Sequence, residues 1–174
     1  MELRAVFLDR EGVLTRKLEK GAYLLRTQDA VLEAGVIEAL RPLVDRRIPL
    51  FIVTNQSCVS RGMITPQECG EIHQRLVWLL ANGKVPIAAS KICPHTDEDA
   101  CDCRKPKPGM ILELCREFGI NPSQTAMIGD STTDVEAGRA AGCAINILLR
   151  PNAVDPTNFV VATLQEAVEL LNEH

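Results

Sequence analysis

The sequence predicts an α/β fold, a doubly wound, Rossmann-like parallel sheet with helices on both faces. Two observations support it: short apolar runs recur along the chain, and helical patterns separate them. Because crossover helices cover both faces of a parallel sheet, its strands are apolar at nearly every position. The predicted strands are 5–8, 49–53, 87–93, 125–128 and 143–149. The predicted helices are 35–47, 66–82, 109–118, 132–141 and 164–172.

Two of these helices carry start signals. The segment 65–68 reads Thr-Pro-Gln-Glu, a capping box with Pro at the first helical position, and the segment 163–166 repeats the box. Within the first of these helices we expect Trp78 to pack into the core. We expect His73 to lie on the helix surface or at its boundary, without a functional role.

The bulk composition restricts the class of protein. A chain of 174 residues suits one domain, 1–174, and no insertion after the first or second strand is long enough for a large cap domain. A net charge of −4 and an aromatic content of 3% argue against nucleic acid as a partner. No apolar run is long enough to span a bilayer and no signal-peptide pattern is visible. We therefore expect a cytoplasmic monomer with no membrane partner.

Polar side chains gather where the predicted strands end. Asp9 follows the first strand, the segment 54–56 (Thr-Asn-Gln) follows the second, and Asp130 follows the fourth, while Lys105 precedes the helix 109–118. In open α/β sheets, ligands bind at the carboxyl ends of the strands. We therefore expect these residues to converge on one site, although they are distant in sequence.

The segment 93–109 holds a candidate zinc site. Cys93, His95, Cys101 and Cys103 place three thiols and one imidazole within eleven residues, and such a set can close a tetrahedron around Zn²⁺. Four protein ligands leave no open position, so the sequence predicts a structural zinc-stapled loop, 93–103. The alternative is two isolated cysteine pairs with a nearby surface histidine. The other four cysteines are scattered, which fits free thiols in a reducing compartment.

The residues after the first and fourth strands suit phosphoryl chemistry. A carboxylate such as Asp9 can attack a phosphoryl group, and Glu11 could donate a proton to the leaving oxygen and later activate water. Taken alone, Asp9 could equally be a solvated residue at the start of a loop. Asp130 suits Mg²⁺, a hard cation that prefers oxygen ligands. Asp134 is either a further magnesium ligand or a favourable charge at a helix N-terminus.

Two further groups could serve the phosphate itself. Thr54 and Asn55 offer a hydroxyl and an amide to phosphate oxygens, and Lys105 could neutralise their charge. Lys107 competes with Lys105 for this role, but its place between two prolines favours an exposed loop residue. The sequence thus predicts a small phosphorylated metabolite as the partner of this site.

Four segments, in chain order, resemble the four motifs of the haloacid dehalogenase superfamily of phosphohydrolases. They are FLDREGV, IVTNQS, CRKPKPGM and MIGDSTTDVEAG. The cysteine and histidine pattern before Arg-Lys-Pro is similar to the zinc loop of a small branch without a large cap. That branch contains the D-glycero-D-manno-heptose 1,7-bisphosphate phosphatases and the histidinol-phosphate phosphatases. Asn-Gln-Ser followed by Ser60-Arg61-Gly62 looks more like the heptose enzymes.

The resemblance implies Mg²⁺-dependent hydrolysis of a small phosphate monoester through an aspartyl phosphate, with a heptose bisphosphate as first choice and histidinol phosphate as second. The implied roles are nucleophile for Asp9, acid/base for Glu11, phosphoryl stabilisation for Thr54 and Lys105, and substrate binding for Asn55, Gln56, Ser57 and Arg104. Mg²⁺ would bind Asp9, the Glu11 carbonyl and Asp130, and Zn²⁺ would bind Cys93, His95, Cys101 and Cys103. The zinc loop would then orient Arg104 and Lys105.

Three residues depart from the family pattern. Glu11 stands in the place of an Asp, and its extra methylene moves the carboxylate by ~1.5 Å. A misplacement of about 1 Å can cost on the order of a hundredfold in rate. Cys58 replaces a Gly whose positive φ the loop could need, and Ser131 replaces a basic residue. The alternative function is therefore a weak or silent relative that binds a phosphorylated ligand or a protein.

A cationic loop follows the first motif. Arg16, Lys17 and Lys20 lie within five residues of one another. A solvated surface is the stronger interpretation of such residues. In the branch that the chain resembles, this loop covers the site, so a second phosphate of the substrate could contact these cations.

Overall fold

The computed structural model describes residues 2–19, 21–151 and 159–173. Its centre is one six-stranded sheet in the order β3-β2-β1-β4-β5-β6, and every neighbouring pair is parallel. The strands are β1 Ala5–Leu8, β2 Leu50–Asn55, β3 Ala89–Cys93, β4 Thr125–Gly129, β5 Ile145–Leu149 and β6 Phe159–Val161. This order is that of a doubly wound sheet, in which the chain starts in the middle and reverses direction once. The predicted fold class is confirmed.

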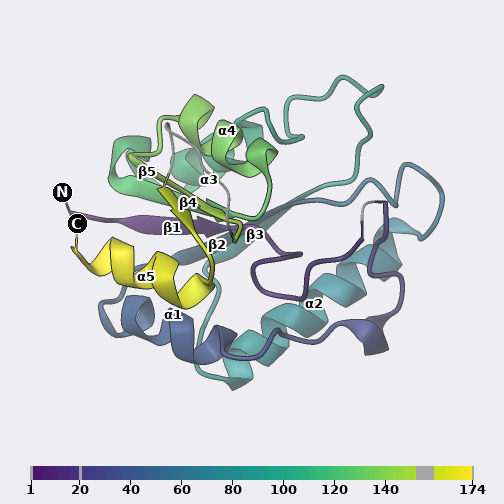
Figure 1. The fold of residues 1–174 in the computed structure, drawn as a ribbon. Helices are drawn as coiled ribbons and strands as arrows, with labels where there is room; N and C mark the ends of the chain where they lie inside the picture. The colour runs from purple at the N-terminus through teal and green to yellow at the C-terminus, as the bar shows by residue number, and fades with distance from the viewer. Residues whose placement is uncertain (1, 20, 152–158, 174) are drawn as a thin grey trace.

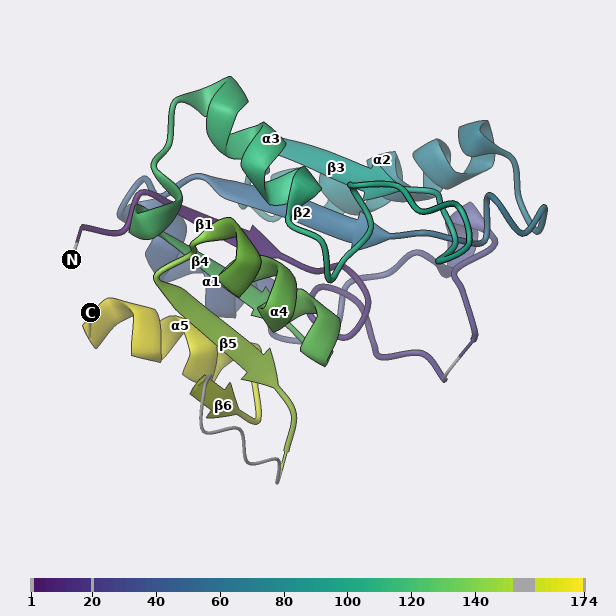
Figure 2. The same cartoon turned by 90° about the horizontal axis from the view of Figure 1, so that it is seen from above.

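Helices cover both faces of the sheet (Figure 1). The α-helices are α1 Val36–Asp45, α2 Pro66–Asn82, α3 Gly109–Phe118, α4 Thr132–Ala141 and α5 Leu164–Glu173, with short 3-10 turns at Thr27–Asp29 and Pro122–Gln124. Helices α1, α2 and α5 lie on one face, and α3 and α4 on the other, as the view from above also shows (Figure 2). None of the helices in the described ranges is both long and apolar enough to cross a membrane.

The alternation of side chains along β1 shows why both faces need a cover. Val6 and Leu8 belong to the hydrophobic cluster on the side of α1 and α5, whereas Ala5 and Phe7 belong to the cluster with residues of α3 and α4. All four side chains are fully buried. Successive side chains of a strand point to opposite faces, so an uninterrupted apolar run requires a packed layer on each side.

Local signals set several helix boundaries. Thr65 accepts a hydrogen bond from the Glu68 backbone N–H at 3.1 Å, and the Glu68 carboxylate accepts from the Thr65 N–H at 2.7 Å. Pro66 follows at the first helical position, so the predicted capping box is confirmed. Asp134 and Ser131 form a second box at the start of α4, which fixes the loop between β4 and that helix.

The structure corrects three expectations. Trp78 is 58% exposed and lies outside the core. His73, expected at the surface, is only 7% exposed, because it lies on the same side of α2 as the buried Ile72, Cys69 and Leu76. The edge strand β6 was not predicted, since three residues with an exposed first position carry a weak periodic signal.

The reversal of strand order positions the site. β1 pairs with β4 in the middle of the sheet, and the Asp9 N–H continues this pairing by donating to the Ile128 carbonyl at 3.0 Å. The loops after β1 and β4 diverge from there towards opposite layers. Such a switch point leaves a crevice at the carboxyl ends of the strands. Asp9 directly follows β1, and Asp130 directly follows β4.

Candidate active site and metal-binding loop

Three carboxylates meet at the switch point. Asp9 follows β1, Asp130 follows β4, and Asp134 lies in the first turn of α4. One oxygen of each lies within 4.8 Å of the others. They line a cavity of about 210 Å³. The remaining lining residues are Glu11, Lys17, Leu18, Glu19, Ala22, Tyr23, Thr54, Asn55, Gln56, Lys105, Ser131 and Thr133.

Lys105 forms ion pairs with two of these carboxylates, Asp9 and Asp134. Its Nζ lies 2.6 Å from Asp9 Oδ1 and 2.6 Å from Asp134 Oδ1, and it donates to the Val53 carbonyl at 2.7 Å. The residue is 4% exposed. Burial alone would lower the pKa of the ammonium, but the carboxylates of Asp134 and Asp9 outweigh burial and hold that pKa above its ordinary value. Lys105 is therefore a fixed positive charge beside Asp9.

The pKa of the Asp134 carboxyl is raised to about 7. Burial is the main cause, and the charges of Asp9 and Asp130 add to it, while Lys105 opposes the shift. The same carboxylate also accepts the Ser131 N–H at 3.0 Å at the start of α4. This agrees with a role at the helix N-terminus, and the role as magnesium ligand stays a prediction. Carboxylate oxygens in this number and spacing suit a hard divalent cation such as Mg²⁺.

The loop after β1 passes close over Asp130. Gly12 has φ +81°, and a Cβ at this position would lie 2.4 Å from Asp130 Oδ2. Only glycine combines the left-handed backbone with this approach. Lys17, which is exposed, then reaches back so that its Nζ lies 2.7 Å from Asp130 Oδ2. The cationic loop thus contributes one charge to the cavity, while Lys20 lies outside the described residues.

Glu11 is held by three donors. Its Oε1 accepts from Arg10 Nε at 2.7 Å, and its Oε2 accepts from Gln56 Nε2 at 2.9 Å and from Thr54 Oγ1 at 3.4 Å. Gln56 and Thr54 are both 1% exposed, and they are themselves joined by a hydrogen bond of 2.9 Å. The longer side chain is therefore tied to the end of β2 rather than free in the cavity.

Asn55 and Ser57 form hydrogen bonds to residues that line the cavity. Asn55 Nδ2 donates to the Lys105 carbonyl, and the Lys105 N–H donates to Asn55 Oδ1, both at 3.1 Å. This pair joins the end of β2 to the segment that carries Lys105. The Ser57 hydroxyl, 2% exposed, lies 2.8 Å from the Tyr23 hydroxyl. Tyr23, not Ser57, lines the cavity.

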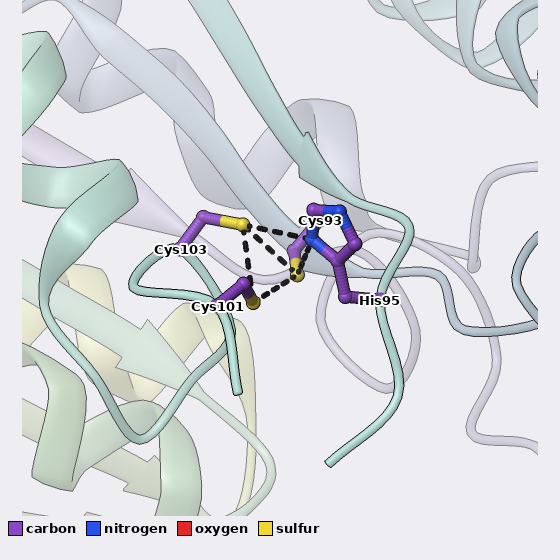
Figure 3. Close-up of side chains that lie close together, drawn as sticks. All are labelled: Cys93, His95, Cys101 and Cys103. Carbon is purple, nitrogen blue, oxygen red and sulfur yellow. Dashed lines mark hydrogen bonds between the residues drawn. The ribbon is translucent and has the colours of Figure 1, made fainter. Parts of the chain in front are cut away.

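The four predicted zinc ligands converge at the end of β3 (Figure 3). The Sγ atoms of the three cysteines lie 3.2 to 3.7 Å apart, and His95 Nδ1 lies 3.3 Å from Cys103 Sγ and 3.6 Å from Cys93 Sγ. A tetrahedron with Zn–S bonds of about 2.3 Å has S–S edges of roughly 3.8 Å. The donor set therefore fits Zn²⁺, with the imidazole facing the thiols through Nδ1.

The cations after the zinc loop point in different directions. Arg104 donates from Nε to Asp97 at 2.6 Å and from Nη1 to the His95 carbonyl at 3.1 Å, so it is bound to the loop. Lys107 donates to the Cys101 carbonyl at 2.7 Å. Among these three cations, only Lys105 lines the cavity. The role of Arg104 in substrate recognition stays a prediction.

Comparison with known proteins decides the family. Residues 4–142 match the model of the haloacid dehalogenase-like hydrolases. The chain belongs to this family. A D-glycero-beta-D-manno-heptose-1,7-bisphosphate 7-phosphatase from Haemophilus influenzae is 37% identical over 153 residues, which cover 84% of this chain and 82% of the relative. The enzyme of the same name from Pasteurella multocida is 35% identical over 97% of this chain and 96% of its own length.

A solved structure agrees with these relatives. The D,D-heptose 1,7-bisphosphate phosphatase from B. bronchiseptica, complexed with magnesium and phosphate, has a TM-score of 0.86 and 27% identity, with all of both chains covered. These matches confirm the resemblance, the fold and the class of enzyme predicted for this haloacid dehalogenase-like hydrolase. They also agree with a metal-dependent site, since the B. bronchiseptica structure contains magnesium.

Two of the three departures have a structural account in this hydrolase. Among the described residues, the non-glycine positions with positive φ are Arg47, Lys84 and Ala100, so Cys58 needs no left-handed backbone. Ser131 caps α4 by accepting the Thr133 N–H at 3.2 Å. The loss of a glycine and of a basic side chain therefore leaves the backbone of both loops intact.

Sequence reasoning missed several lining residues of this hydrolase, among them Tyr23 and Leu18. Both lie in the loop between β1 and α1, where the sequence has no periodic pattern. The loop as a whole could be assigned to the site because it follows Asp9. Which of its side chains turns inward depends on contacts such as that between Tyr23 and Ser57, which no local signal records.

Proposed function

We propose that this protein is a Mg²⁺-dependent phosphatase that hydrolyses a small sugar phosphate through a phosphoryl group carried on Asp9. The observation that carries the proposal is the buried Asp9 carboxylate, paired with Lys105 at 2.6 Å and facing a cavity with Asp130. An exposed loop aspartate would have no need of a buried ammonium partner. The family match supports hydrolysis as the reaction class.

In the first step an Asp9 carboxylate oxygen attacks the phosphorus, and the bond from phosphorus to the sugar oxygen breaks. Glu11 delivers a proton to that oxygen, so the sugar leaves as an alcohol. Lys105 and the Thr54 hydroxyl offset the charge on the transferring group, because both lie at the cavity beside Asp9. The immediate products are the free alcohol and an aspartyl phosphate.

In the second step Glu11 takes a proton from water, and the resulting hydroxide attacks the same phosphorus. The bond between phosphorus and the Asp9 oxygen breaks, which releases inorganic phosphate and restores the carboxylate. Glu11 then carries the proton that it needs for the next cycle. Every proton and bond is accounted for by these two carboxylates and one water.

Two metal ions fit the donor sets. Asp9, Asp130 and the Glu11 backbone carbonyl would hold Mg²⁺, with Asp134 close by, and the bound ion would neutralise phosphate charge and orient the phosphoryl group. Zn²⁺ would be held by the four residues of the 93–103 loop as a closed structural site. The close approach of the Asp9, Asp130 and Asp134 carboxylates supports the first assignment, and the spacing of the four loop donors supports the second.

As substrate we propose a heptose 1,7-bisphosphate, cleaved at the 7-phosphate. The curated relatives named for this reaction, at 37% and 35% identity, favour it over histidinol phosphate. Asn55 and Gln56 line the cavity and are proposed substrate contacts. For Ser57 and Arg104, which lie outside the lining, the proposal rests on the family resemblance alone. The small cavity suits a phosphorylated sugar better than a macromolecule.

We also propose that the chain works as a single-domain monomer in the cytoplasm. All seven cysteines are unbridged, which agrees with a reducing compartment. Three of them line the proposed zinc site, and the other four are buried. A secreted protein of this cysteine content would more commonly use disulfides.

Phosphate release from heptose 1,7-bisphosphate, with and without Mg²⁺, tests the proposal. Asp9→Asn should reduce kcat/KM by at least about a thousandfold, because the amide is a poor nucleophile. Acid-labile phosphate should form on the wild-type protein and not on this variant. Asn121→Asp, remote from the cavity in the turn before Pro122–Gln124, is a control that should retain full activity. Retained turnover in Asp9→Asn would contradict the nucleophile assignment.

A further inference from the structure

The acid/base candidate Glu11 is held in a way that a shorter side chain could not share. Gln56 Nε2 donates to its Oε2 at 2.9 Å, and Arg10 Nε donates to its Oε1 at 2.7 Å. The two donors bind different oxygens of the carboxylate and so fix its plane. This pair of hydrogen bonds, from Arg10 and Gln56 to Glu11, is called the grip below. An aspartate at this position would end roughly 1.5 Å earlier and lie beyond hydrogen-bond distance of both.

Gln56 is well placed to act as the fixed member of this grip. It is 1% exposed, its Nε2 also contacts Thr54 Oγ1 at 2.9 Å, and its backbone N–H donates to the Cys93 carbonyl at 2.7 Å. Cys93 is one of the zinc-loop donors at the end of β3. The Gln56 side chain is thereby held by Thr54 of β2, and its backbone by the last residue of β3. The side-chain amide therefore has little freedom to follow a moving carboxylate.

Arg10 completes the grip from the other side. It is 1% exposed, although its Nη1 has no hydrogen-bond partner among the described residues. A buried guanidinium without full pairing is costly, and its ion pair with Glu11 offsets part of that cost. Arg10 and Gln56 therefore both act on a carboxylate that is itself only partly buried and borders the cavity.

We propose that Gln56, with Arg10, is a positioning residue that holds the longer Glu11 side chain where it can exchange protons at the reacting phosphate. This inference rests on the proposed function, since it takes Glu11 as the acid/base. An unrestrained glutamate must give up side-chain conformational freedom to reach one geometry. With the grip in place, that freedom is already lost before substrate binds.

A double-mutant cycle tests the proposal with the full-length, metal-loaded protein. Gln56→Met removes the donor but keeps the length of the side chain, and it should lower kcat by roughly ten- to a hundredfold. In the Glu11→Asp background the same substitution should change kcat less than about threefold, because the shorter carboxylate does not reach Gln56. Gln74→Met, at an exposed position of α2, is the matched control and should behave as wild type.

A second readout separates positioning from structural damage. With p-nitrophenyl phosphate the leaving group needs no proton, so Gln56→Met should form the phosphoenzyme at the wild-type rate but hydrolyse it slowly. Acid-labile phosphate on Asp9 should therefore accumulate in this variant during turnover. Gln56→Ala serves as a second variant if the Met variant does not fold.

The outcomes distinguish the two proposals. If the wild type forms no phosphoenzyme with either substrate, the proposed function fails. If the wild type is active and Gln56→Met loses the same factor in both backgrounds, or slows phosphoenzyme formation from p-nitrophenyl phosphate, Gln56 does not act through Glu11. An unchanged kcat in Gln56→Met would overturn the inference outright.

Discussion

The buried histidine of α2 should make the protein sensitive to acid. His73 is 7% exposed, and neither of its ring nitrogens has a hydrogen-bond partner in the described part of the chain. Burial, with a smaller contribution from the positive charge of Arg10, lowers the pKa of the imidazole from 6.5 to about 4. The native state therefore keeps His73 neutral at pH values where the unfolded chain would already be protonated.

The size of the effect follows from the two pKa values. Between pH 6.5 and pH 4 the unfolded chain binds one more proton than the native state, so the free energy of unfolding falls as the pH falls. Between pH 7 and pH 5 the loss amounts to about 2 kcal/mol. That loss is substantial beside the roughly 5–15 kcal/mol by which an ordinary native domain is stable against unfolding.

His73→Leu removes the titrating group, and chemical denaturation of both proteins at pH 7 and pH 5 measures the result. The wild type should lose about 2 kcal/mol more than the variant over this interval. Gln74→His, which adds an exposed imidazole on the neighbouring position of α2, should lose no more than the wild type. If the 93–103 loop holds zinc as proposed, its release in acid would affect all three proteins alike and cancel in the comparison. Equal losses in wild type and His73→Leu would refute the reasoning.

Two further predictions concern the metal sites. The double variant Cys101→Ser/Cys103→Ser, verified to be free of zinc, should become sensitive to proteolysis within 93–108 and lose substrate turnover; unchanged kinetics would contradict a role for the loop in orienting the site. Gly12→Ala should weaken Mg²⁺ binding measured by calorimetry, because its Cβ would displace the Asp130 carboxylate and its φ is +81°. A matched Gly21→Ala, at a positive φ with open space around it, should leave Mg²⁺ affinity unchanged.

Much of the site could be predicted because its residues follow strands. Asp9, Thr54 and Asp130 each come directly at or after the end of an apolar run, and parallel strands bring such ends to one edge. The zinc donors could be predicted for a different reason, since all four lie within one short segment and need little of the fold to meet.

Other features depend on contacts between distant segments. The periodic pattern of α2 does not tell which of its borderline residues faces inward, so Trp78 was wrongly expected in the core and His73 at the surface. The family resemblance predicts that Arg104 contacts substrate. In the structure its side chain is bound to Asp97 and the His95 carbonyl and does not line the cavity, so this role stays a prediction. Neighbours in sequence can point in opposite directions once a loop is closed.

By itself the sequence determined the parallel α/β fold and the four family motifs, and it predicted the two clusters of candidate metal ligands. These depend on short-range patterns: apolar runs, the residues that end them, and ligands close together in the chain. Only the tertiary structure decided which groups hold the Glu11 carboxylate. This carboxylate is tied to Arg10 beside it and to Gln56 at the end of another strand, 45 positions away in sequence. The extra methylene of Glu11 can be interpreted only when the positions of its hydrogen-bond donors, Arg10 and Gln56, are known.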